Sequence, residues 1–123
     1  MKHHFFFTLF ILSSTLSFAQ EITFETDTID YGIIEKGSDG KRIFKFTNTG
    51  KNPLVISTVK GNCGCNTATH PKELILTGES SEIISHYDTS RKGYFVKYFS
   101  VTSNDKNAIN KQLVIKGTVI DKE

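Results

Sequence analysis

KRIFKFTN, residues 41–48, places Phe44 and Phe46 two positions apart, with Lys45 and Thr47 between and after them. Because successive side chains of an extended strand point to opposite faces, the two phenylalanines share one face and the polar residues share the other. A strand with this pattern buries one face in a core and leaves the other in water. The polar residues 49–52 and Pro53 then end the strand.

Similar short runs rich in Ile, Val, Phe, Thr and Tyr lie on both sides, separated by Gly, Asn, Asp and Ser. They occupy residues 22–26, 31–34, 54–59, 81–88, 94–103 and 111–120, with a short additional candidate at 74–76. No window shows a sustained helical period. We predict an all-β fold, an immunoglobulin-like antiparallel β-sandwich of seven to eight strands. Residues 22–26 and 31–34 would form one broken edge strand, and residues 54–59 a central strand beside residues 41–48.

The N-terminus has the pattern of an export signal. Lys2 supplies a positive charge, residues 5–12 are apolar except for Thr8, and Ser17 and Ala19 are small residues at the positions that precede cleavage. We expect residues 1–19 to be a signal peptide and residues 20–123 to be one domain in the periplasm or secreted. The apolar run is too short to span a bilayer. The first cysteine is far from the cleavage position, so we expect neither a membrane span nor a lipid anchor.

Charge and motif content argue against several functions. Loss of Lys2 with the signal lowers the formal charge of the chain from +2 to +1, and no basic stripe remains. We therefore expect no nucleic-acid partner. The sequence contains no Gly-x-Ser-x-Gly elbow and no phosphate-binding loop. We expect no catalytic residues, no cofactor and no enzymatic activity.

The two cysteines lie in the stretch NCGCN, residues 62–66. An exported chain meets oxidising conditions, which favours a bond between Cys63 and Cys65. In an extended strand their Cα atoms would lie at roughly the upper limit for a disulfide, so the bond requires a turn, which Gly64 permits.

Three interpretations of this pair stay open. The cysteines could form a local clip or pack as small buried groups. They could form a strained, labile dithiol that exchanges with partners. Cys63 and Cys65 could instead bind a soft ion such as Cu(I), together with His70 or with His86 from a neighbouring strand.

Two surface features point to partners or modification. Tyr94, Val96 and Tyr98 alternate with core positions and would form an outward stripe of the kind that interfaces use, unless an edge strand or loop covers them. We therefore expect a binding partner among other envelope or secreted proteins. Thr28, within Asp27-Thr28-Ile29, resembles the O-glycosylation signal of exported Bacteroidota proteins and would lie in an exposed turn.

A series of short motifs resembles domain-of-unknown-function family 1573, which is common among exported Bacteroidota proteins and similar in pattern to hydin-type and major-sperm-protein-type domains. The motifs span about Phe24 to Val119 and occupy residues 30–32, 44–50, 53–56, 63–65, 78–79, 88–89, 93–95, 103–104 and 117–119. The resemblance implies a β-sandwich in the cell envelope and no established activity. Asn66 and Thr77 depart from the family pattern, which has Thr and Pro there.

Overall fold

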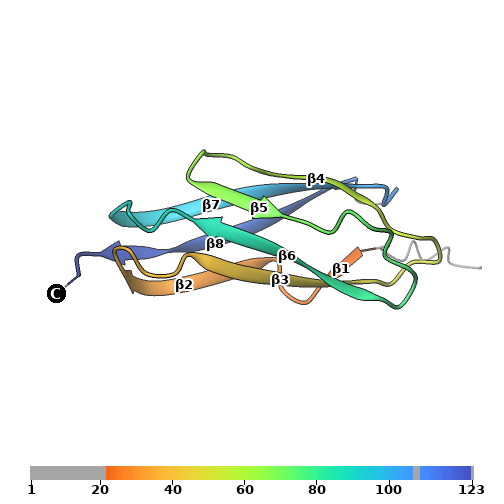
Figure 1. Cartoon of the computed structure of the whole chain (residues 1–123), viewed down its shortest axis with the longest axis horizontal. Coiled ribbons are helices and arrows are strands. Elements are labelled where there is room, and N and C mark those ends of the chain that lie inside the picture. The colour runs from red at the N-terminus through yellow and green to blue at the C-terminus, as the bar shows by residue number, and fades with distance from the viewer. Residues whose placement is uncertain (1–21, 107–108, 123) are drawn as a thin grey trace, which may run out of the picture.

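The computed structural model describes residues 22–106 and 109–122, so the predicted signal peptide and its cleavage position lie outside the described residues. Eight strands in this part of the chain form an elongated sandwich of two four-stranded sheets (Figure 1). The strands are β1 Ile22–Phe24, β2 Thr28–Glu35, β3 Lys41–Asn48, β4 Ile56–Gly61, β5 Asn66–Thr69, β6 Ser80–Tyr87, β7 Gly93–Ser103 and β8 Asn110–Ile120. The all-β sandwich is confirmed.

One sheet has the order β1-β3-β6-β5 and the other β2-β8-β7-β4. All pairs are antiparallel except β2 with β8, which is parallel. The expected broken edge strand thus forms the edges of both sheets, because the chain changes sheet between β1 and β2. A bulge between Asp30 and Ile33 bends β2, and Gly32 there adopts a φ of 67°, a conformation that glycine adopts without steric cost.

The core lies between the sheets and contains the residues that alternation placed inward. Phe44 and Phe46 of β3 and Phe99 of β7 are among its largest fully buried side chains. Near one end, the rings of Tyr87 and Phe95 stack with centroids 3.8 Å apart, and Tyr31 meets Phe95 edge-on at 5.4 Å. Burial of each large apolar side chain stabilises the fold by roughly 1.5–3 kcal/mol, so this layer holds the sheets together.

The prediction that residues 54–59 form a central strand beside residues 41–48 is wrong. Most of this run belongs to β4, which pairs with β7 in the opposite sheet and forms an edge, while Leu54 makes only an isolated bridge to Ile75. The expected strand at 74–76 is reduced to that bridge. The buried side chain of Asn48 holds the loop that follows β3, because its Nδ2 donates to the carbonyls of Asn52 and Ile75. Asn104, which follows β7, then joins this segment to the other sheet: its Oδ1 accepts from the N–H of Val55, its Nδ2 donates to the carbonyl of Pro53, and its backbone N–H donates to the carbonyl of Val55.

Candidate functional site

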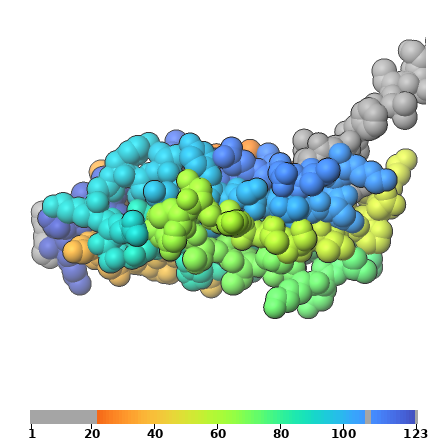
Figure 2. All heavy atoms as spheres, turned by 90° about the horizontal axis from the view of Figure 1, so that it is seen from above, coloured from red at the N-terminus to blue at the C-terminus, as the bar shows by residue number. Residues whose placement is uncertain are grey.

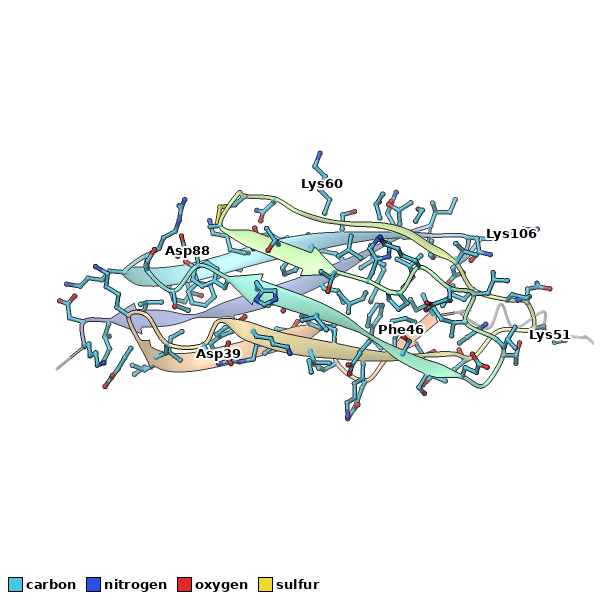
Figure 3. The ribbon with its side chains drawn as sticks, viewed as in Figure 1. Asp39, Phe46, Lys51, Lys60, Asp88 and Lys106 are labelled. Atoms are coloured by element: carbon cyan, nitrogen blue, oxygen red, sulfur yellow. A yellow bond between two sulfur atoms is a disulfide. The ribbon has the colours of Figure 1, made fainter. Side chains whose placement is uncertain are left out.

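The cysteines lie in the turn that joins β4 to β5. Figure 3 shows their disulfide as a yellow bond at this turn, and the Cα atoms of Cys63 and Cys65 are 5.1 Å apart. The backbone N–H of Asn66 donates to the carbonyl of Cys63 at 3.3 Å and closes the turn. The need for a turn is therefore confirmed, but the strand that precedes it is an edge strand. Gly64 has no positive φ, and a Cβ there would meet nothing within 4 Å, so this turn does not demand glycine.

Two asparagines that flank the cysteines anchor the turn to β7. The Asn66 side chain accepts from the N–H of Cys63 and donates to the carbonyl of Tyr98, both at 3.1 Å. The Asn62 side chain accepts from the N–H of Tyr98 at 3.1 Å. Sequence reasoning did not assign a role to either asparagine, although both adjoin the cysteines. Asn66, a departure from the family pattern, is thus a structural anchor of this turn.

The two sulfurs have different surroundings. Cys65 is 4% exposed and belongs to the core, whereas Cys63 is only partly buried. Residues 59–64 and 66–68 line an open cleft of about 520 Å³ beside Cys63. From above, the lime-green segment that joins β4 to β5 lies at the surface (Figure 2). Access to the disulfide is therefore from the Cys63 side.

Asp88 lies on the other side of the turn, where its backbone N–H donates to the carbonyl of Cys65 at 2.8 Å. Hydrogen bonds from the hydroxyl and then the backbone N–H of Ser90 lower the pKa of the Asp88 carboxyl, and Arg91 contributes less. A carboxylate therefore stays ionised near the turn over the ordinary pH range.

The histidines considered as metal ligands lie elsewhere. His70 follows β5, and its Nδ1 is 2.9 Å from the carbonyl of Pro71. His86 lies on the outer face of β6, paired in register with Lys41 and Thr67. Among residues 22–106 and 109–122, no group of three or more His, Cys, Asp or Glu residues could hold a metal ion.

The predicted stripe of β7 faces outward. Tyr94 is 73% and Tyr98 39% exposed, and Val96 between them is partly exposed. The surface continues onto the neighbouring strands. Tyr98 pairs with Val114 of β8, and Thr118 of β8 pairs with Tyr94 on one side and with Ile33 of β2 on the other. We call this surface the tyrosine face; it consists of Ile33, Tyr94, Val96, Tyr98, Val114 and Ile120.

Thr28, the glycosylation candidate, is the first residue of β2 rather than part of a turn. It is exposed, and its hydroxyl donates to the carboxylate of Asp27 at 3.2 Å. The described part of the chain also lacks any helix with the length and hydropathy needed to cross a membrane.

Two sheets with these strand orders, one parallel pair and a disulfide turn between edge strands define an immunoglobulin-like β-sandwich domain. The family described as protein of unknown function (DUF1573) matches residues 22–119, and the chain belongs to it. No curated protein matches the sequence.

Solved structures share the fold. A protein of unknown function from Porphyromonas gingivalis W83 has a TM-score of 0.71 at 21% identity, covering 85% of this chain and 50% of its own. The PapD-like domain 7 of human CEP192 has a TM-score of 0.65 at 12% identity, covering 98% and 100%. The periplasmic chaperone SfaE has a TM-score of 0.53 at 9% identity, covering 83% and 58%. This chain thus spans half of the Porphyromonas protein, and the likenesses concern the fold alone.

Proposed function

We propose that this protein is an exported immunoglobulin-like domain that acts in the periplasm or outside the cell by binding another protein through the tyrosine face. The proposal is for binding rather than catalysis. The predicted signal peptide supports export, and a periplasmic chaperone among the proteins of similar fold is compatible with it.

The observation that carries the proposal is the exposure of apolar side chains on three adjacent strands. Ile33 of β2 is 74% exposed, and Tyr94 of β7 lies in the same register row with comparable exposure. Scattered single apolar residues are normal on a surface, but a cluster of exposed apolar side chains on one face is a candidate interaction site. Tyrosine is also enriched at protein interfaces. Because β7 and β8 are central strands, the face is already ordered and binding costs little conformational entropy.

Lys116 lies in the middle of the tyrosine face and gives it a polar centre. It pairs in register with Val96 on one side and Asp30 on the other. The partner chemistry that fits is therefore an apolar surface with a hydrogen-bond acceptor or carboxylate near its middle.

Site-specific photo-crosslinking in cells that export the protein tests this proposal. A crosslinking side chain at Tyr98 is expected to yield one discrete product with another protein, and Tyr94→Ala is expected to weaken it. A crosslinker at Ile43 is the control, because Ile43 lies on the outer face of the other sheet and is also 39% exposed. Equal products from both positions, or a product that Tyr94→Ala leaves unchanged, would reject the tyrosine face as the binding surface.

Thiol–disulfide exchange is a second candidate function, favoured by the position of the disulfide on an open turn with one cysteine accessible. Copper binding applies only to the reduced protein, because the disulfide form has no thiolate to offer. Unchanged copper content of the reduced protein after Cys63→Ser and Cys65→Ser replacement would reject that use of the pair.

A further inference from the structure

We propose that the disulfide has a fixed polarity: Cys63 carries the sulfur that a partner thiol attacks, and Cys65 is the leaving and resolving sulfur. This inference rests on the second candidate function, thiol–disulfide exchange with a protein dithiol. It assigns different roles to two cysteines that the sequence presents as equivalent.

Access is the first argument. Thiol–disulfide exchange requires the attacking thiolate to approach one sulfur along the axis of the bond. Cys65 packs in the core and is 4% exposed, whereas Cys63 lines the open cleft between β4 and β5. An attacking group can therefore reach Cys63 without displacing core side chains.

Hydrogen bonding is the second argument, and it concerns the reduced protein, in which one of the two cysteines attacks a partner disulfide. The backbone N–H of Cys65 donates to Sγ of Cys63 at 3.0 Å. In the reduced protein, a donor held at this position stabilises a Cys63 thiolate. Sγ of Cys65 instead lies 4.0 Å from the Oδ1 of Asn66, which accepts hydrogen bonds and favours the protonated thiol.

The orientation of the Asn66 amide follows from its other contacts. Its Nδ2 donates to the carbonyl of Tyr98, so its Oδ1 is the atom that faces the N–H of Cys63 and the sulfur of Cys65. Burial of Cys65 acts in the same direction as this acceptor, because a charged thiolate is disfavoured away from water. Both effects make Cys63 the more acidic thiol, and therefore the nucleophile of the reduced protein when it attacks a partner disulfide. The reverse reaction passes through the same mixed disulfide on Cys63. Acidity alone would favour Cys63 as the leaving group, so the assignment of Cys63 as the attacked sulfur rests on access.

The exchange balances in two steps. A thiolate of the partner dithiol attacks Sγ of Cys63, the Cys63–Cys65 bond breaks, and Cys65 leaves as a thiolate that takes up a proton. The second partner thiol loses its proton and attacks the partner sulfur of the mixed disulfide, which releases Cys63. The partner is oxidised by two electrons to a disulfide, and Cys63 and Cys65 are reduced to a dithiol.

Mapping of the mixed disulfide tests the polarity on the unaltered protein. The oxidised protein is mixed with reduced glutathione, quenched with N-ethylmaleimide and fragmented in a mass spectrometer. We expect glutathione on Cys63 and maleimide on Cys65. Glutathione on Cys65 would overturn the assigned polarity while leaving exchange intact. The absence of any adduct or reduction, at a concentration that reduces a model Cys-Gly-Cys peptide, would reject exchange itself and the polarity with it.

Alkylation rates give an independent measurement. At neutral pH, Cys65→Ser, which retains Cys63, is expected to react with iodoacetamide at least about 10-fold faster than Cys63→Ser, because a lower pKa and better access act together. In urea, where both variants are unfolded, the rates should converge. A faster native reaction of Cys63→Ser would contradict the assignment.

Discussion

Reduction of the Cys63–Cys65 disulfide is expected to leave the domain folded and to lower its free energy of unfolding by only about 1.6 kcal/mol. The bond joins residues separated by two positions, so it closes a loop of three residues. The chain-entropy relation gives about 1.6 kcal/mol for such a loop at 25 °C, against about 3 kcal/mol for a loop of 15 residues. The turn also keeps its hydrogen bonds from Asn62 and Asn66 to β7 when the bond is open.

Urea unfolding of the oxidised protein and of the protein kept in a phosphine reductant measures this difference. A loss of about 1.6 kcal/mol changes the unfolding equilibrium roughly 15-fold. With a slope of about 1.5 kcal/mol per molar urea, the midpoint should fall by about 1 M while the slope stays the same. The Cys63→Ser/Cys65→Ser double variant is the matched control, because the reductant should not change its midpoint.

A loss above about 4 kcal/mol, or unfolding upon reduction, would refute this reasoning, because the bond would then hold the fold together as a long-loop disulfide does. The outcome also bears on exchange. By thermodynamic linkage, the fold stabilises the bond by the same free energy by which the bond stabilises the fold. About 1.6 kcal/mol corresponds to roughly 35 mV in reduction potential, so a small value means that the fold protects this bond only weakly from reduction.

Three further changes have defined expectations. Asn66→Ala should lower the free energy of unfolding by about 2–3 kcal/mol in urea titrations, because it removes two hydrogen bonds and leaves backbone groups without their partner. Gly117→Ala should cost about 1–3 kcal/mol, since its Cβ would lie 2.8 Å from the Cβ of Tyr31, whereas Gly64→Ala, with open space, should change stability by less than about 0.5 kcal/mol. Burial raises the pKa of Tyr31 and Tyr87 above 10.0. The unfolded chain therefore loses these protons first, so the contribution of the two tyrosines to stability should be constant below about pH 10 and fall as the pH rises above it. Tyr31→Phe should reduce this fall in thermal midpoints measured between about pH 9 and 12.

The alternation of apolar and polar residues predicted most strands and their inward faces, because one face of each strand is buried and the other is exposed to solvent. Phe44 and Phe46 on β3, and Phe95 and Phe99 on β7, are in the core as expected. The same rule cannot say which sheet a strand joins, since both sheets of a sandwich demand the same period of two. The error at residues 54–59 has this origin. The contacts that hold this segment join residues far apart in the sequence: Asn48 binds the carbonyl of Ile75, and Asn104, which follows β7, binds residues 53–55 to the other sheet.

The change of sheet between β3 and β4 also explains why Cys63 and Cys65 differ in burial. Had β4 paired with β3, the turn would lie within one sheet, and period-two alternation would give Cys63 and Cys65 the same face. Because β4 is an edge of one sheet and β5 an edge of the other, the turn instead bridges the gap between the sheets. Its second cysteine enters the core while its first faces the open cleft. The asymmetry on which directional exchange depends is thus a consequence of sheet topology, which spacing alone does not encode.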